Sequence, residues 1–272
     1  MTQIKRFFIN KLFIVISTLT ALLGLVFLGW ILWTLFVKGF EALSLTVFTT
    51  DLVNGGLRNL LWGQFVLSVL ATVLAVPIGL LAGIYLQEYG NHSRYAEFIR
   101  ELSDVMMSAP SIVVGTFVYA ILVVPVGHTN GWAGIVALAI LMLPIVVRTT
   151  DDMLSLIPRE LREAGVALGV PKYRIITDII IRAAKVGIVT GLLLAFARVM
   201  GETAPLLYTS GTSEYWTTNL GETFPSLTVA IYNLATMPDE ALSKLAWAGA
   251  LLLTLFVLIL NITGRYLIRD KR

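Results

Sequence analysis

The chain has 272 residues, of which 57% are hydrophobic and only 14% are charged, with a formal net charge of +3 and a mean hydropathy of +0.84. Soluble globular domains carry roughly 25% charged residues, so this composition excludes a soluble globular protein and indicates a membrane protein. The absence of cysteine excludes disulfide bonds and thiolate metal sites. Two isolated histidines, His92 and His128, make no zinc site on their own.

Five uncharged or nearly uncharged stretches provide six candidate membrane spans, because a bilayer core of about 30 Å requires roughly 20 apolar residues per helix. The longest stretch has room for two helices, since turn-forming residues cluster at 127–131. In chain order the stretches are 12–37, 59–87, 105–147 (two helices), 186–208 and 245–264. They predict an all-α polytopic membrane protein with six transmembrane helices.

Lysine and arginine residues predict the orientation of these helices, because cytoplasmic loops carry an excess of both. Sixteen of them lie at the N-terminus, in the 88–101 and 148–185 segments and at the C-terminus. The opposite side carries three, Lys38, Arg58 and Lys244. This difference predicts that both termini and the 148–185 segment are cytoplasmic.

Small residues recur every four positions in two of the predicted helices, and such faces let helix backbones approach closely in lipid. They are Ala75, Gly79 and Gly83 in one helix and Gly187, Gly191 and Ala195 in the other. We expect tight helix packing along both faces. The outer segment 209–244 is too apolar for a flexible loop, and we expect a short helix within it.

The largest predicted cytoplasmic loop, residues 151–182, contains a short amphipathic helix that begins after Ser155 and Pro158. Its apolar residues follow with helical spacing, and Gly169 and Pro171 end it. A helix this short cannot cross the bilayer. We therefore expect it to lie on the membrane surface or to dock to a soluble protein.

This loop resembles the EAA loop of ABC-importer permeases, which reads Glu-Ala-Ala, three residues, Gly, nine residues and Ile-x-Leu-Pro. The matching residues are Glu163, Ala164, Gly169 and Ile179, and the departures are Gly165, Ile181 and Arg182 in place of Ala, Leu and Pro. In that family the loop is a coupling helix that fits a groove on the ATPase subunit. The resemblance implies that Glu163, Ala164, Gly165 and Gly169 lie at this contact.

A second resemblance covers most of the chain from about residue 60. Segments 108–115, 131–134, 144–150 and 197–207 look like the phosphate-importer permeases of the PstA type. The resemblance implies a type I ABC-importer bundle that transports inorganic phosphate. We divide the chain into residues 1–58 (N-terminal tail, first transmembrane helix and outer loop) and a permease core at 59–272, with the coupling loop at about 151–182.

Arg198 lies about 12 residues into its predicted span, near mid-bilayer at 1.5 Å per residue. An ionised side chain there costs at least about 2.5–3.5 kcal/mol, which indicates a functional site. Glu202 follows at i+4 on the same face, and we expect Arg198 to point into the bundle or across a subunit contact. Arginine binds phosphate through a planar fork of donors, so we interpret Arg198 and Glu202 as part of the substrate pathway. The alternative is a static ion pair.

Arg148 ends the fourth predicted span and either lines the exit of the pathway or sets the orientation of its helix.

No lysine precedes a serine or threonine, so the chain lacks a Walker A motif and cannot hydrolyse ATP itself. The resemblance implies a PstC-like second permease subunit, PstB-like ATPase subunits that bind ATP and Mg²⁺, and a PstS-like phosphate-binding protein, at the bacterial inner membrane.

Three alternatives remain open at this point. One is a permease for another oxyanion or small solute. A stand-alone ion-coupled carrier would use Arg198 and Glu202 as a proton relay. A membrane enzyme comes third, because the sequence has no clustered His, Asp and Glu and no nucleophile–base pair to support one.

Overall fold

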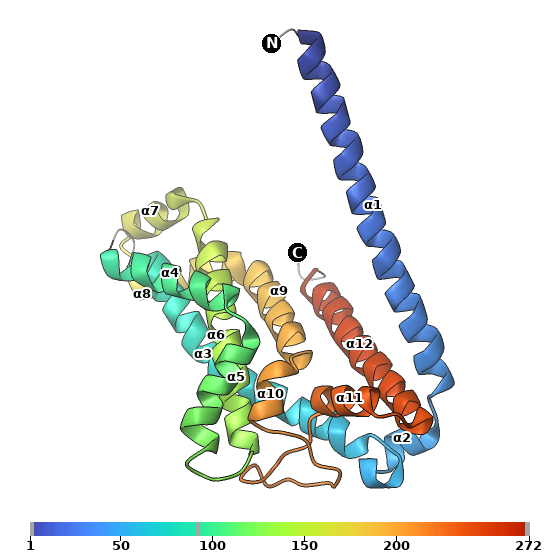
Figure 1. The fold of residues 1–272 in the computed structure, drawn as a ribbon. Coiled ribbons are helices and arrows are strands. Elements are labelled where there is room, and N and C mark those ends of the chain that lie inside the picture. Colours follow the sequence, from blue (N-terminus) through green and yellow to red (C-terminus); the bar gives the residue numbers. More distant parts are fainter. Residues whose placement is uncertain (1–2, 91–92, 270–272) are drawn as a thin grey trace.

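The structure is a computed structural model that describes residues 3–90 and 93–269, and all regular secondary structure in these residues is helical. Figure 1 shows the helices in sequence colours. In chain order they are α1 (Gln3–Glu41), α2 (Leu45–Thr49), η1 (Leu52–Asn54), α3 (Arg58–Glu88), α4 (Arg94–Ser108), α5 (Ser111–Val118), η2 (Tyr119–Val123), α6 (Gly131–Ser155), α7 (Arg159–Ala167), α8 (Lys172–Arg174), η3 (Ile175–Ile180), α9 (Ile181–Met200), α10 (Ala204–Tyr208), α11 (Leu227–Thr236) and α12 (Glu240–Arg269).

Within the described residues, five helical segments are long and apolar enough to cross a membrane, and a sixth crossing exists if one bent pair of helices counts as a single span. The five are α1, α3, α6, the continuous run from α8 through η3 to α9, and α12. The predicted all-α polytopic fold is therefore confirmed. The number of six depends on the bent pair.

The third predicted span is not a straight helix. α4 and the α5–η2 segment meet at an angle of 99°. The break falls at Ala109, whose φ of −68° and ψ of 140° are extended, immediately before Pro110. Proline disfavours the helical conformation in the residue before it and lacks an N–H donor, which accounts for the break. The prediction missed this kink because the apolar run continues through it.

α6 is the central helix of the bundle, and both predicted small-residue faces pack against it. A Cβ on Gly79 of α3 would lie 2.7 Å from Val146, and one on Gly83 would lie 2.6 Å from Thr150. On the other side of α6, a Cβ on Gly191 of α9 would clash with Thr149. The expectation of close backbone packing is thus confirmed for both faces.

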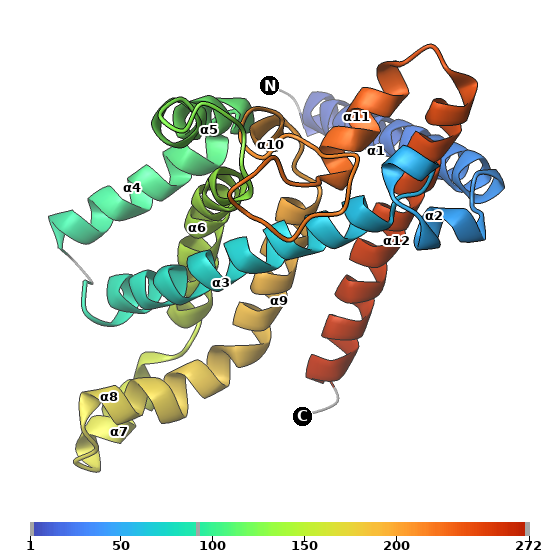
Figure 2. The same ribbon diagram turned by 90° about the horizontal axis from the view of Figure 1, so that it is seen from below.

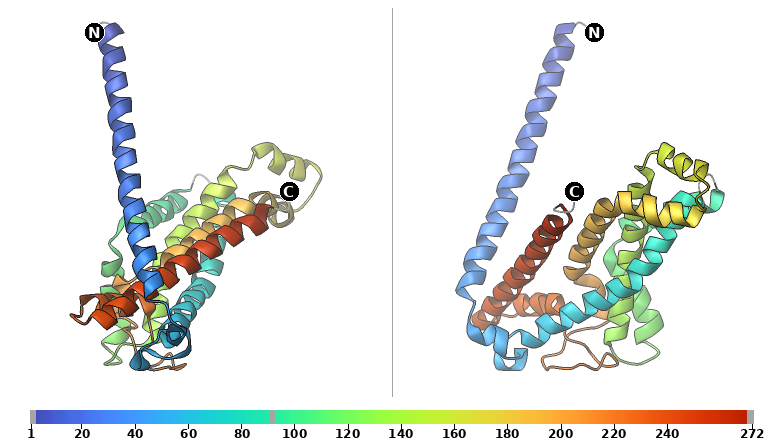
Figure 3. Two further views of the ribbon diagram at one scale, coloured as in Figure 1. Left: turned by 90° about the vertical axis from the view of Figure 1, so that its right-hand side faces the viewer. Right: turned by 180° about the vertical axis from the view of Figure 1, so that it is seen from behind.

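The bundle has two distinct ends (Figures 1 and 2). α7 and α8 lie at one end, near the end of α3, and α2, α11 and the segment 209–226 lie at the other. The beginning of α1 and the end of α12 lie on the side of α7 (Figure 3). α1 contacts α12 near Gly39 and Leu251, but the apolar window of its span is 0% buried.

The outer segment is ordered against the start of α6, and α11 confirms the short helix expected there. The backbone N–H groups of Asn130 and Gly131 donate to the carbonyls of Thr209 and Glu222 at 2.9 and 3.1 Å. Phe224 is 1% exposed and belongs to the main apolar core. The segment therefore covers this end of α6.

Candidate functional site: a broken helix and a coupling loop

The predicted fifth span is interrupted between its two charged residues, Arg198 and Glu202. α9 ends at Met200, residues 201–203 leave the helix, and α10 begins at Ala204 with Pro205 in its first turn. The Nε of Arg198 lies 3.4 Å from Oε1 of Glu202. The structure thus brings the predicted pair together, but Glu202 follows the helix end instead of continuing the helical face.

The position of Arg198 within its helix differs from the prediction. The helical run begins at Lys172, well before residue 186, so Arg198 lies in its last turn and not near its middle. The Arg198 side chain is 50% exposed. Leu194, one turn earlier on the same helix face, is 49% exposed, whereas Ala195 of the small-residue face is buried. The Arg198 side chain is therefore not buried by the rest of this chain, and its position in the bundle or across a subunit contact stays a prediction.

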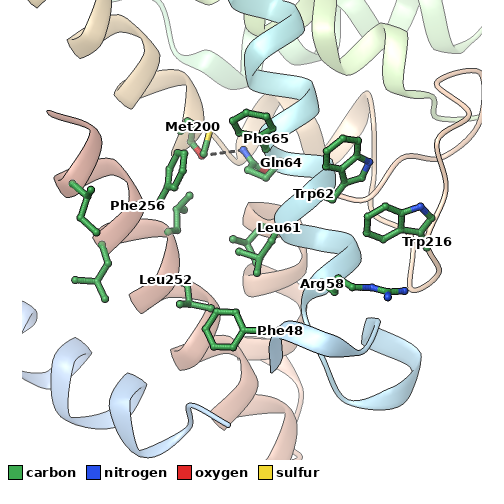
Figure 4. Close-up of a pocket in the computed structure, with 14 residues that line it drawn as sticks. Phe48, Arg58, Leu61, Trp62, Gln64, Phe65, Met200, Trp216, Leu252 and Phe256 are labelled. Atoms are coloured by element: carbon green, nitrogen blue, oxygen red, sulfur yellow. Dashed lines mark hydrogen bonds between the residues drawn. The ribbon is translucent and has the colours of Figure 1, made fainter. Parts of the chain in front are cut away.

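Gln64 of α3 holds the broken end of α9, and the sequence reasoning missed it. Its side chain is 1% exposed and donates through Nε2 to the carbonyl of Met200 at 2.9 Å (Figure 4). Its Oε1 accepts a hydrogen bond from Ser226 Oγ at 3.1 Å, and Thr228 Oγ1 donates to the carbonyl of Glu202 at 2.9 Å. Carbonyls freed by a helix break inside lipid require such partners. The signal was a glutamine within an otherwise apolar span.

The predicted coupling helix exists as α7, and Gly169 ends it as expected. Gly169 has a φ of +71°, in the left-handed region that favours glycine. Its N–H donates to the carbonyl of Val166 at 2.9 Å, and the N–H of Val170 donates to that of Gly165 at 3.1 Å. This is the Schellman arrangement of a helix end.

The residues of the EAA-like segment have two different environments. Gly165 is buried, and a Cβ there would lie 2.9 Å from Ile175 of η3, which explains glycine where the family pattern has alanine. Glu163, Ala164 and Gly169 are exposed. Leu168, which is 82% exposed, places an apolar side chain on the same open surface.

Arg162, which no motif singled out, fastens α7 to the bundle. Its guanidinium donates to both carboxylate oxygens of Glu88 at the end of α3, with the shortest distance 2.7 Å, and Glu88 is only 6% exposed. It also donates to the carbonyls of Leu154 and Ile157, at 2.9 and 2.6 Å, where α6 ends. Lys172 adds a bond from Nζ to the Glu88 carbonyl at 2.6 Å.

Arg148 does not end its helix, because α6 continues to Ser155. Its Nε lies 3.5 Å from Asp152 of the same helix and 3.7 Å from Asp104 of α4. The side chain is 36% exposed. Its assignment to the pathway exit stays a prediction.

Among the described residues, no group of three or more His, Cys, Asp and Glu side chains has an arrangement that could hold a metal ion.

Comparison with known proteins places this architecture in a family. The family described as "Binding-protein-dependent transport system inner membrane component" matches residues 75–272. The chain is 48% identical over 268 residues to the phosphate transport system permease protein PstA of Yersinia pestis, covering 97% of this chain and 91% of that protein. It is 49% identical over 267 residues to PstA of Haemophilus influenzae, covering 97% and 95%.

A more distant relative and a solved structure extend the comparison. The chain is 35% identical over 265 residues to the probable PstA of Methanocaldococcus jannaschii, covering 96% of this chain and 94% of that protein. The inward-facing structure of the MetNI methionine ABC transporter has a similar fold, with a TM-score of 0.62 at 19% identity over 80% of this chain and 95% of that chain. The chain therefore belongs to the family of binding-protein-dependent transport system inner membrane components, which it shares with the PstA permeases.

Proposed function

We propose that this chain is the membrane-embedded permease subunit of an ATP-driven importer of inorganic phosphate. Nearly full-length similarity to PstA permeases carries this proposal. Members of the matching family are components of binding-protein-dependent systems, which argues against a stand-alone carrier. The chain forms the translocation path and contributes no ATPase site of its own.

Arg198 is the residue we assign to the anion. Its guanidinium is always charged and binds phosphate oxygens through a fork of donors. The single contact of 3.4 Å to Glu202 and the half-exposed side chain leave donors accessible from outside this chain. Glu202 compensates the charge while the path is empty and releases the guanidinium when phosphate arrives. The exposed face of α9 then lines a path that a second permease subunit completes.

Uptake of labelled phosphate by membrane vesicles tests the role of Arg198. Arg198→Gln removes the charge at similar size, and we expect uptake to be abolished while the complex still assembles. Leu194→Gln is the matched control, because it introduces the same side chain one turn earlier on the same exposed face. Uptake at the normal rate in Arg198→Gln vesicles would remove Arg198 from the pathway and leave the static ion pair as its role.

α7 is the segment that we assign to the ATPase contact. Its exposed surface combines Glu163, Ala164 and Leu168 with Gly169 at the helix end. Arg162 anchors the buried side of the helix to both α3 and α6. A helix so anchored moves as one body with the bundle, so closure of the ATPase subunits reaches the broken end of α9. ATP and Mg²⁺ bind to those PstB-like subunits.

Leu168→Glu tests this contact without touching the fold, because the Leu168 side chain is 82% exposed. We expect the variant to reach the membrane but to lose co-purification of the ATPase. Leu156→Glu is the control, since Leu156 is 71% exposed just outside α7. Retention of the ATPase by the Leu168 variant would reject the assignment.

The same assignment implies an orientation in the bacterial inner membrane. If α7 contacts an ATPase, the end of the bundle that carries α7, the start of α1 and the end of α12 is cytoplasmic. The lysine and arginine distribution supports this orientation independently. The outer end, with α11 and the segment 209–226, then faces a PstS-like binding protein, and a PstC-like subunit completes the permease.

A further inference from the structure

A cavity of about 640 Å³ opens between α3 and α12 (Figure 4), on the part of the bundle away from α7. Its size is typical of pockets that enclose a small-molecule ligand or part of one. The walls are almost entirely apolar, with Leu61 and Phe65 from α3 and Leu252 and Phe256 from α12. α3 and α12 are both candidate membrane spans, so an acyl chain is a chemically suitable occupant of the apolar cavity between them.

Arg58 and the two stacked indoles of Trp62 and Trp216 line one side of this cavity. Arg58, at the first residue of α3, donates from Nε to Oδ1 of Asp51 at 3.1 Å, and the two side chains are 49% and 16% exposed. The Arg58 guanidinium lies 5.0 Å from the ring of Trp216. Trp62 and Trp216 stack with ring centroids 5.7 Å apart. Figure 4 shows Arg58, Trp62 and Trp216 on the side of the pocket away from Leu252 and Phe256.

We infer that this cavity is a binding site for one phospholipid of the outer leaflet, with an acyl chain in the apolar pocket and the headgroup at Arg58. Tryptophan concentrates at the level of lipid headgroups, so Trp62 and Trp216 mark the depth of the interface. An arginine guanidinium binds phosphate oxygens through a planar fork of donors, and a lipid headgroup presents such oxygens. Only Nε of Arg58 has a side-chain hydrogen-bond partner among the described residues, and the two terminal nitrogens face the rim.

A lipid phosphate is the headgroup feature that the cavity can recognise. Asp51, the ion-pair partner of Arg58, is 16% exposed and does not line the cavity, so it adds no second charged contact for a headgroup. Arg58 lines the cavity and retains its two terminal nitrogens as donors to phosphate oxygens. The occupant is therefore defined by a phosphate and an acyl chain, both of which phosphatidylethanolamine carries.

An acyl chain bound in the cavity would also contact the broken end of α9. Gln64 and Met200, which are joined by the hydrogen bond that holds the end of α9, both line the cavity. The lipid therefore packs against the segment that carries Arg198 on its other side. The site itself does not depend on which solute the protein transports, so its test is separate from that of the proposed function.

Photolabelling of the assembled complex in native membranes tests the site. The probe is phosphatidylethanolamine with a diazirine near the end of one acyl chain. We expect adducts to concentrate on peptides that contain Phe65 and Phe256, and to fall at least fivefold in Arg58→Gln and in Leu255→Trp, which fills the pocket with apolar volume. Lys244→Gln is the control, because it removes one cation at the same end of the bundle outside the cavity.

The outcomes that would overturn the inference are distinct. Labelling at Leu81, which is 70% exposed on α3 away from the cavity, equal to that at Phe65 would indicate ordinary bilayer contact. Equal labelling by a diacylglycerol probe, which carries no phosphate, would reject the contact between Arg58 and the headgroup phosphate. Photocrosslinks from Phe65 to another subunit in place of lipid would show that protein covers the cavity.

Discussion

The ion pair between Arg162 and Glu88 yields the most quantitative prediction. Removing one partner of a buried ion pair costs about 3–5 kcal/mol, because the other charge is left without compensation. Glu88 is 6% exposed and Arg162 is 22% exposed. The partial access of water to Arg162 favours the lower limit, about 3 kcal/mol for Arg162→Gln. Since Arg162 also caps the end of α6, this cost falls on the docking of α7 to the bundle.

Hydrogen exchange of the α7 amides measures this cost. A loss of about 3 kcal/mol corresponds to a roughly 100-fold rise in the population of the locally open state and in the exchange rate. Gly165 lies inside the helix, and the amide of Val170 closes its end, so these residues provide the readout. The control is Lys244→Gln, which removes one partner of the exposed ion pair with Glu240. We expect it to change the free energy of unfolding by less than about 0.5 kcal/mol.

A double variant separates charge from packing. In Arg162→Gln with Glu88→Gln no uncompensated carboxylate remains, so exchange should be at least about tenfold slower than in Arg162→Gln alone. Unchanged exchange in the single variant would refute the anchoring role of Arg162. Equal exchange in the single and double variants would refute the electrostatic explanation.

Two further predictions concern the helix ends. Gly169→Ala should destabilise the end of α7 by about 1 kcal/mol because residue 169 has a positive φ, whereas Gly169→Asn should cost less. The hydrogen-exchange rate of the Val170 amide measures both effects, and equal effects would contradict the conformational cause. Gln64→Leu should lower the stability of the solubilised protein by about 1–3 kcal/mol by leaving the Met200 carbonyl without its partner. Thermal unfolding measures this loss against Gln87→Leu, the same change at a partly exposed glutamine near the other end of α3.

The sequence predicted features that depend on local pattern. Apolar run length located the spans, and the four-residue spacing of Gly79 and Gly83 identified helix faces that pack closely. Gly169 followed by a proline two residues later located the end of α7. Each of these rules depends on neighbouring residues alone, which explains why they held.

The features that were missed depend on contacts between distant segments. Gln64 and Met200 are far apart in the sequence, and nothing in either segment reveals that one satisfies the carbonyl of the other. The same holds for Arg162 and Glu88. The position of Arg198 within its helix was mispredicted because the helical run begins earlier and ends sooner than hydropathy suggests. Charged residues at 182 and 185 concealed the early start.

The bend at Pro110 has a consequence for the surrounding lipid. Beyond the bend, α5 and η2 comprise residues 111–123, which rise only about 20 Å at 1.5 Å per residue. A bilayer core is about 30 Å thick, so if the bent pair forms one span, this segment is too short to cross the core by itself. Such hydrophobic mismatch is relieved by local thinning of the membrane or by a neighbouring protein, at a modest cost for each ångström. Membrane thickness thus becomes a variable that acts on this protein.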